Sequence, residues 1–173
     1  MENKAKGMTL EEFKELGPCW LEDGERAAKL EKIGKRKGRW TALDVLDLPD
    51  EEVSPADKLW AVLRLEFIDG PVLHGFACRC AEEALKQVEK PDPRSVAAIE
   101  AKRRWLRGEI PDGELAEARD AARAAASDAA WAAASDAASI AAWYAARDAA
   151  SRQQVEILRD MLEKEDATCQ LKT

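Results

Sequence analysis

The chain has 173 residues with a formal net charge of −7; 35% of its residues are charged and 46% are hydrophobic. This balance can bury one ordinary core while keeping a solvated exterior, so it indicates a globular protein and excludes a disordered one. The acidity disfavours a general nucleic-acid binder, and no run of about 18 apolar residues is present that could span a bilayer.

Residues 1–54 are predicted to form an N-terminal lobe of short helices. Thr9-Leu-Glu-Glu12 is a capping box, in which the threonine hydroxyl and the glutamate carboxylate satisfy exposed backbone N–H groups at a helix start. Two more short helices are expected, over Glu25–Ile33 and Thr41–Leu46.

Residues 55–167 are predicted to form a second domain, an alanine-rich helical bundle. Ser54-Pro55-Ala-Asp57 places a cap residue, a first-turn proline and an early acid in the order that a helix start prefers. An apolar stripe at steps of three and four residues then predicts a helix up to Asp69-Gly70; its members are Ala56, Leu59, Trp60, Leu63 and Phe67. Two further helices are expected over residues 71–88 and 93–108.

The C-terminal tract contains no helix breaker, because every glycine and proline lies at or before Gly113. Ala-Ala pairs recur every four residues from Asp120 to Ala150. A single helix from Glu114 to Glu165 would be roughly 78 Å long, which exceeds the width of a compact domain of this size. The fold expected is therefore all-α, with either one long alanine-rich C-terminal helix or a helix pair that breaks near Ser135–Ser139.

The spacing of the alanine pairs predicts how the tract packs. A four-residue repeat exceeds the helical period of 3.6, so the pairs drift around the axis by about 40° per repeat and would face several neighbours. Three interpretations are open: a close-packed bundle core, a surface that mimics a charged ligand, and an ice-binding helix. The core is favoured, and the ice-binding helix lacks a threonine row, since no threonine lies between Thr41 and Thr168.

The residue types that carry catalysis do not form a recognisable set. His74 is the single histidine and has no identifiable nucleophile beside it in the sequence, so a structural role is expected. The four cysteines, Cys19, Cys78, Cys80 and Cys169, are too widely spaced for a zinc site. No phosphate loop or serine nucleophile motif is present. The prediction is a non-enzymatic protein with no catalytic residue, no metal and no cofactor.

A basic run stands out against the acidic background. Lys35, Arg36, Lys37 and Arg39 precede Trp40, a combination of positive charge and aromatic ring that suits phosphate and base contacts. A second run, Lys102–Arg107, contains Trp105. Neither run forms a known motif, so pairing within the molecule, against the acidic C-terminal helix, is favoured over nucleic-acid contact.

Several stretches between residues 57 and 150 point to a known family. They are Lys58-Leu-Trp-Ala61, Phe76-Ala-Cys-Arg-Cys-Ala-Glu-Glu-Ala84, Pro91-Asp-Pro-Arg-Ser-Val-Ala-Ala-Ile-Glu-Ala101, Trp105-Leu-Arg-Gly-Glu-Ile110 and Leu115-Ala-Glu-Ala-Arg119. Together they resemble the alanine-rich immunity proteins of bacteria and, in related form, of phage genomes. The resemblance implies a helical domain that neutralises a toxin by binding it and that carries no catalytic residues. In a phage it would imply an anti-defence inhibitor, for instance an anti-CRISPR protein.

The favoured function is therefore a non-enzymatic inhibitor that binds an effector protein, either a toxin or a nuclease complex. The residues expected to contact that partner are Asp128, Trp131, Asp136 and Trp143. The alternative is a small nucleic-acid-associated or scaffold protein that uses its basic runs, and a third hypothesis is homodimerisation through the alanine-rich helix alone. Because Met1–Lys6 leads into no apolar signal core, a cytoplasmic location is expected, in the host cytoplasm if the gene is a phage's.

Overall fold

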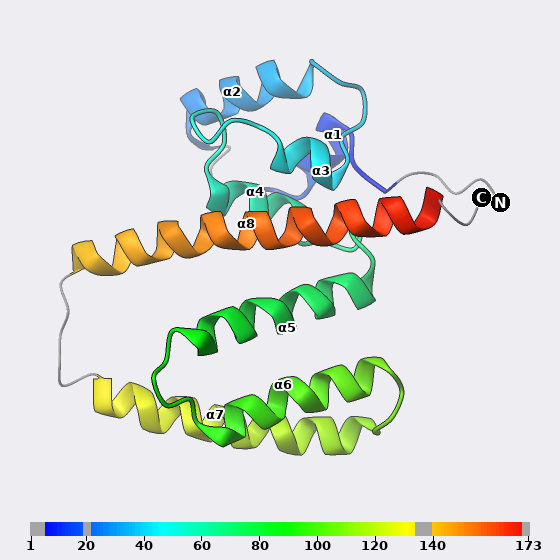
Figure 1. The fold of residues 1–173 in the computed structure, drawn as a ribbon. Coiled ribbons are helices and arrows are strands. Elements are labelled where there is room, and N and C mark those ends of the chain that lie inside the picture. The colour runs from blue at the N-terminus through cyan, green and yellow to red at the C-terminus, as the bar shows by residue number, and fades with distance from the viewer. Residues whose placement is uncertain (1–5, 19–21, 134–139, 171–173) are drawn as a thin grey trace. The chain divides into compact units, whose positions relative to one another are not determined.

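The computed structural model describes residues 6–18, 22–133 and 140–170, and its regular elements in those ranges are all helices (Figure 1). The prediction of an all-α protein is confirmed. The helices are α1 Leu10–Glu15, α2 Gly24–Gly34, α3 Ala42–Leu46, α4 Pro55–Val62, α5 Gly70–Lys86, α6 Pro93–Leu106, α7 Asp112–Ala133 and α8 Ile140–Gln170.

The chain divides into two compact units. Unit 1 consists of Met1–Gly70 with Ser151–Thr173, and unit 2 consists of Pro71–Ala150. The boundary expected after residue 54 lies inside unit 1, just before α4, and the C-terminal part of α8 belongs with the N-terminal helices. Each unit is described by itself below.

Side-chain caps start α1, α2, α3 and α4 of unit 1, and those of α1 and α4 were predicted; Asp23 caps α2. Thr9 Oγ1 accepts a 3.2 Å hydrogen bond from the Glu12 N–H, and Glu12 Oε2 accepts one of 2.8 Å from the Thr9 N–H, which completes the capping box of α1. Thr41 caps α3 in the same way, and Ser54 caps α4 with Pro55 in its first turn.

Helix α4 is shorter than its apolar stripe predicts. It ends at Val62, because the Leu63 backbone leaves the helical region with ψ at 61°. The chain then turns through Arg64, whose carbonyl accepts hydrogen bonds from the N–H groups of Phe67 and Ile68, so both of these side chains are buried from a turn and not from a helix. Trp60, expected on the buried stripe, is 40% exposed.

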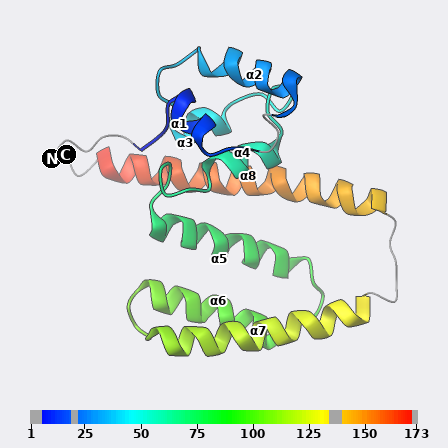
Figure 2. The same cartoon turned by 180° about the vertical axis from the view of Figure 1, so that it is seen from behind.

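The core of unit 1 joins the N-terminal helices to the C-terminal part of α8 (Figures 1 and 2). Leu46, Val62 and Leu158 are fully buried. Arg159 in α8 donates a hydrogen bond of 2.7 Å to the Leu46 carbonyl and one of 3.0 Å to Asp47 Oδ1 at the end of α3. Apolar burial and charged hydrogen bonds therefore hold this part of α8 against α3 and α4.

In unit 2, α6 and α7 form a hairpin around a small core (Figure 1). Ala101, Ile110 and Leu115 are buried there, and Trp105 and Ala118 pack against them. Gly108, with φ at 72°, lets the chain turn between the two helices.

In the described part of α7, the packed residues face one side of the helix. The less exposed positions follow one stripe, namely Leu115, Ala118, Ala122 and Ala125. Alanines on the other sides are exposed, among them Ala116, Ala121 and Ala124. The side chains of residues 127–146 lie outside the description, so the expectation that the alanine pairs of the whole repeat face several neighbours stays a prediction.

In the alanine-rich tract, α7 ends at Ala133 and α8 begins at Ile140, and residues 134–139 lie outside the described ranges. The choice between one helix and a helix pair therefore stays a prediction. Within the part of the chain that the structure describes, no helix has both the length and the apolar character needed to cross a membrane.

Candidate functional site

The four residues predicted to contact a partner protein belong to the alanine-rich tract. Asp136 lies outside the described residues. Asp128 and Trp131 fall in α7 and Trp143 falls in α8, at positions where the side chains are outside the description. Their role stays a prediction.

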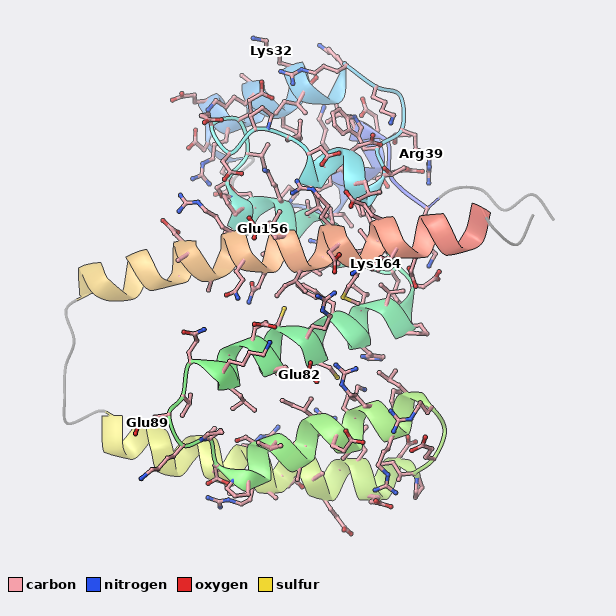
Figure 3. The ribbon with its side chains drawn as sticks, viewed as in Figure 1. Lys32, Arg39, Glu82, Glu89, Glu156 and Lys164 are labelled. Atoms are coloured by element: carbon pink, nitrogen blue, oxygen red, sulfur yellow. The ribbon has the colours of Figure 1, made fainter. Side chains whose placement is uncertain are left out.

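The first basic run is fully engaged in ion pairs. Arg36 forms a two-pronged pair with Glu52 at 2.7 and 3.0 Å, which raises the pKa of the guanidinium and lowers that of the carboxyl. Lys37 Nζ lies 2.6 Å from both carboxylate oxygens of Asp44. Arg39, labelled in Figure 3, pairs through Nη1 with Glu12 at 3.1 Å, and Lys35 pairs with Glu31 at 3.5 Å.

These pairs correct one expectation about the run. The prediction placed its acidic partners on the C-terminal helix, whereas they lie on α1, α2, α3 and the segment before α4. The short helices pack against one another, so the acids nearest to the run belong to the same lobe. The outcome is a network of charges that links the elements of the N-terminal lobe.

The second basic run is engaged in the same manner within unit 2. Arg103 makes two 2.8 Å hydrogen bonds to Glu82 of α5, and Arg104 makes one of 2.9 Å to Glu114 of α7. Arg107 pairs with Glu109 in the turn between α6 and α7. Lys102 Nζ lies 3.8 Å from the centre of the Trp105 ring, a cation–π contact.

His74 packs edge-on against Trp105, with 5.5 Å between the ring centres. Burial lowers the pKa of His74, and the positive charge of Lys102 lowers it further. The indole N–H of Trp105 donates a 2.7 Å hydrogen bond to Asp112 Oδ1. The cluster ties α5, α6 and the start of α7 together, which agrees with the structural role expected for this histidine.

The described thiols are poorly suited to nucleophilic chemistry. Cys78 is buried and Cys80 is half-buried, and burial is the largest cause raising the pKa of each thiol above its ordinary value. Among the described residues, no group of three or more histidine, cysteine, aspartate and glutamate side chains gathers to hold a metal ion.

Unit 1 contains a cavity of about 280 Å³ that sequence reasoning missed. Its wall is built from α1, α2, α3, α4 and the segments between them, and includes Phe13, Ile33, Trp40, Val45 and Phe67. Charged residues line it too, among them Arg26 and Lys29 of α2. No local pattern marks such a site, because its residues come together only through contacts between helices distant in sequence.

No family model, no curated protein and no solved structure matches the chain. The resemblance to alanine-rich immunity proteins therefore stays a prediction from the sequence.

Proposed function

We propose that this chain is a non-enzymatic inhibitor that neutralises an effector protein, a toxin or a nuclease complex, by binding it directly. The observation that supports the proposal is that the cations of the two basic runs form ion pairs within the molecule. Seven of their lysine and arginine side chains are paired with acids of the same molecule, these being Lys35, Arg36, Lys37, Arg39, Arg103, Arg104 and Arg107.

Because these cations are paired within the molecule, the charge that remains for a partner to contact is mainly acidic. The chain has 34 aspartates and glutamates against 27 lysines and arginines. Exposed acids include Glu117 and Asp120 on α7 and Glu156 and Glu163 on α8. An acidic helical surface attracts basic proteins and speeds their association, and nuclease and toxin surfaces that contact nucleic acid are basic.

The partner-contact residues Asp128, Trp131, Asp136 and Trp143 are part of the proposal. Tryptophans beside acids have the composition of energetically dominant interface positions, an aromatic anchor with charges that steer association. The resemblance over residues 57–150 supports the same class of function.

The experiment begins with affinity capture by the tagged full chain and proceeds with the purified captured protein. A one-to-one complex that abolishes the partner's toxicity or nuclease activity is expected. The D128N/D136N variant should associate more slowly and with weaker salt dependence. The E11Q/E15Q variant, which removes the same charge from exposed positions of α1, should behave like the original chain. Capture of DNA or RNA without any protein contradicts the proposal.

The alternative, a nucleic-acid-associated or scaffold protein, has less support. Phosphate contact by the basic runs would have to displace the ion pairs of residues 35–39 and 103–107, each with an acid already in place. Salt-sensitive oligonucleotide binding that is lost in a K35Q/R36Q/K37Q/R39Q variant would favour it.

Homodimerisation through the alanine-rich tract and a cytoplasmic location complete the proposal. Sedimentation over a range of concentrations tests the dimer. A monomer at every concentration would remove dimerisation from the proposal and leave the inhibitor function to the single chain.

A further inference from the structure

The cavity of unit 1 has the size of a small ligand site. Its volume is about 280 Å³, whereas one water needs only about 10–15 Å³. The apolar part of the wall is contributed by separate elements, including Phe13 of α1, Leu30 and Ile33 of α2, Val45 of α3 and Ala61 of α4. An apolar occupant would gain dispersion contacts with these side chains.

Trp40 gives this wall a rigid aromatic surface. Its backbone pairs with Met8, through hydrogen bonds of 2.7 and 2.9 Å, in an isolated antiparallel bridge. The neighbouring Arg39 holds the Gly7 carbonyl with one guanidinium nitrogen and Glu12 with another. The backbone that carries the ring is thus held by this pairing and by the charged cross-link of Arg39.

The same tryptophan has an unmet polar requirement. Within the described part of the chain, Trp40 Nε1 is buried and has no hydrogen-bond acceptor. A buried N–H without an acceptor costs free energy. Because this atom is buried, it is the face of the indole ring, and not its N–H, that the wall offers to an occupant.

The charged residues of the wall are unequally engaged. Four of them are acids, namely Asp50, Glu51, Glu52 and Asp57. Asp50 is held by Lys58 at 2.7 Å, Glu52 by Arg36 at 2.7 Å and Asp57 by the Ser54 hydroxyl at 2.8 Å. The cations contact their neighbours more loosely. Arg26 Nε lies 3.8 Å from Asp23 Oδ2, and Lys29 Nζ lies 3.5 Å from the Glu51 carbonyl oxygen.

We propose that unit 1 binds a small apolar monocarboxylate in this cavity. The apolar body lies against Phe13, Ile33 and Trp40, and the carboxylate is held by Arg26 and Lys29, whose exposed positions on α2 put the charged end at the solvent side. The site stands apart from the proposed inhibitor function, because neither its residues nor its chemistry involve the alanine-rich tract.

The first test compares three probes of equal chain length on the full-length protein. Octanoate should bind about tenfold more tightly than octanol, because charge-assisted hydrogen bonds are stronger than neutral ones, and octylamine should bind least. Calorimetry gives the affinities. In a ¹⁵N–¹H spectrum the Trp40 indole signal, assigned by its disappearance in W40F, should shift on addition of octanoate.

Variants then separate the charged end from the apolar body. The R26Q/K29Q variant should lose about tenfold in octanoate affinity and little in octanol affinity. Its matched control is K32Q/K35Q, which removes the same charge from α2 and its C-cap at positions outside the cavity wall. The control should bind octanoate like the original chain.

The A61L variant fills part of the cavity and should weaken both octanoate and octanol by about tenfold while the thermal unfolding midpoint stays unchanged or rises. Three outcomes overturn the proposal: no octanoate binding at millimolar concentration, equal binding of the three probes, or an equal loss of octanoate affinity in K32Q/K35Q and R26Q/K29Q. None of these three outcomes bears on the capture of an effector protein by the tagged chain, so the ligand site and the inhibitor function are tested separately.

Discussion

Lys58 of α4 is buried, with 2% of its side chain exposed, and its Nζ donates a 2.7 Å hydrogen bond to Oδ1 of Asp50. Asp50 keeps 47% of its side chain exposed, and Arg152 of α8 lies 3.8 Å from its other oxygen. A single carboxylate thus neutralises a buried ammonium and lies next to a cation from the far end of the chain. The pair joins the segment before α4 to the core of unit 1.

Replacing Asp50 by asparagine should destabilise the protein markedly. The change leaves a buried ammonium without its counter-charge, which costs about 3–5 kcal/mol for a fully buried pair, and about 2–3 kcal/mol is expected here because the carboxylate is half exposed. Urea denaturation measures the loss. Lys58→Met should be close to neutral, since an apolar side chain of similar volume removes the buried charge as well. A similar loss in both variants would show that packing, and not the charge, is responsible.

Gly7 should not tolerate a side chain. A Cβ added there would lie 2.2 Å from the Trp40 carbonyl oxygen, and a backbone atom held in the Met8–Trp40 bridge cannot move aside. Gly7→Ala is expected to lower the free energy of unfolding by about 2–3 kcal/mol. Gly38→Ala is the control, because a Cβ at Gly38 meets nothing within 4 Å. Equal stability of the two variants would contradict the close approach at Gly7.

Stability should fall in acid through the carboxyls of unit 1. The backbone N–H of Thr9 lowers the pKa of Glu12, Lys14 lowers that of Glu31, and Arg36 lowers that of Glu52, each below the ordinary value of 4.5. A carboxyl with a lowered pKa in the folded state stabilises above its unfolded pKa, and this contribution is lost as pH falls through the folded value. Urea denaturation between neutral pH and about pH 3 should show the decline, and an E31Q/E52Q variant should show a shallower one.

His74 should titrate below its ordinary pKa of 6.5. Burial disfavours the charged imidazolium, and the positive charge of Lys102 adds to the effect. Since this is the single histidine, its ring signals in an NMR titration report it without ambiguity. Lys102→Met should raise the midpoint only part of the way to 6.5, because burial is the larger cause. A midpoint above 6.5 in the original chain would contradict the arrangement.

The helix starts were predictable because each depends on residues three positions apart. Thr9 with Glu12 forms the predicted capping box, and Ser54 caps α4 as its sequence predicts; Thr41 with Asp44 forms a second capping box of the same spacing, which was not predicted. The end of α4 was not predictable, since the apolar spacing continues past Val62 while the backbone turns at Leu63. Apolar spacing indicates which residues become buried but not the backbone conformation that buries them. Phe67 is buried here, although it lies in a turn and not in a helix.

The helical class follows from local sequence, because helix propensity, caps and apolar spacing act over a few residues and need no distant partner. Helix packing, in contrast, is what brings Arg159 to Leu46 and Asp47, the basic runs to acids of their own unit, and Trp40 and Arg26 to one cavity. Such contacts join residues far apart along the chain, and their partners are chosen by the packing of whole helices. The local sequence pattern therefore does not predict which distant residues will be in contact.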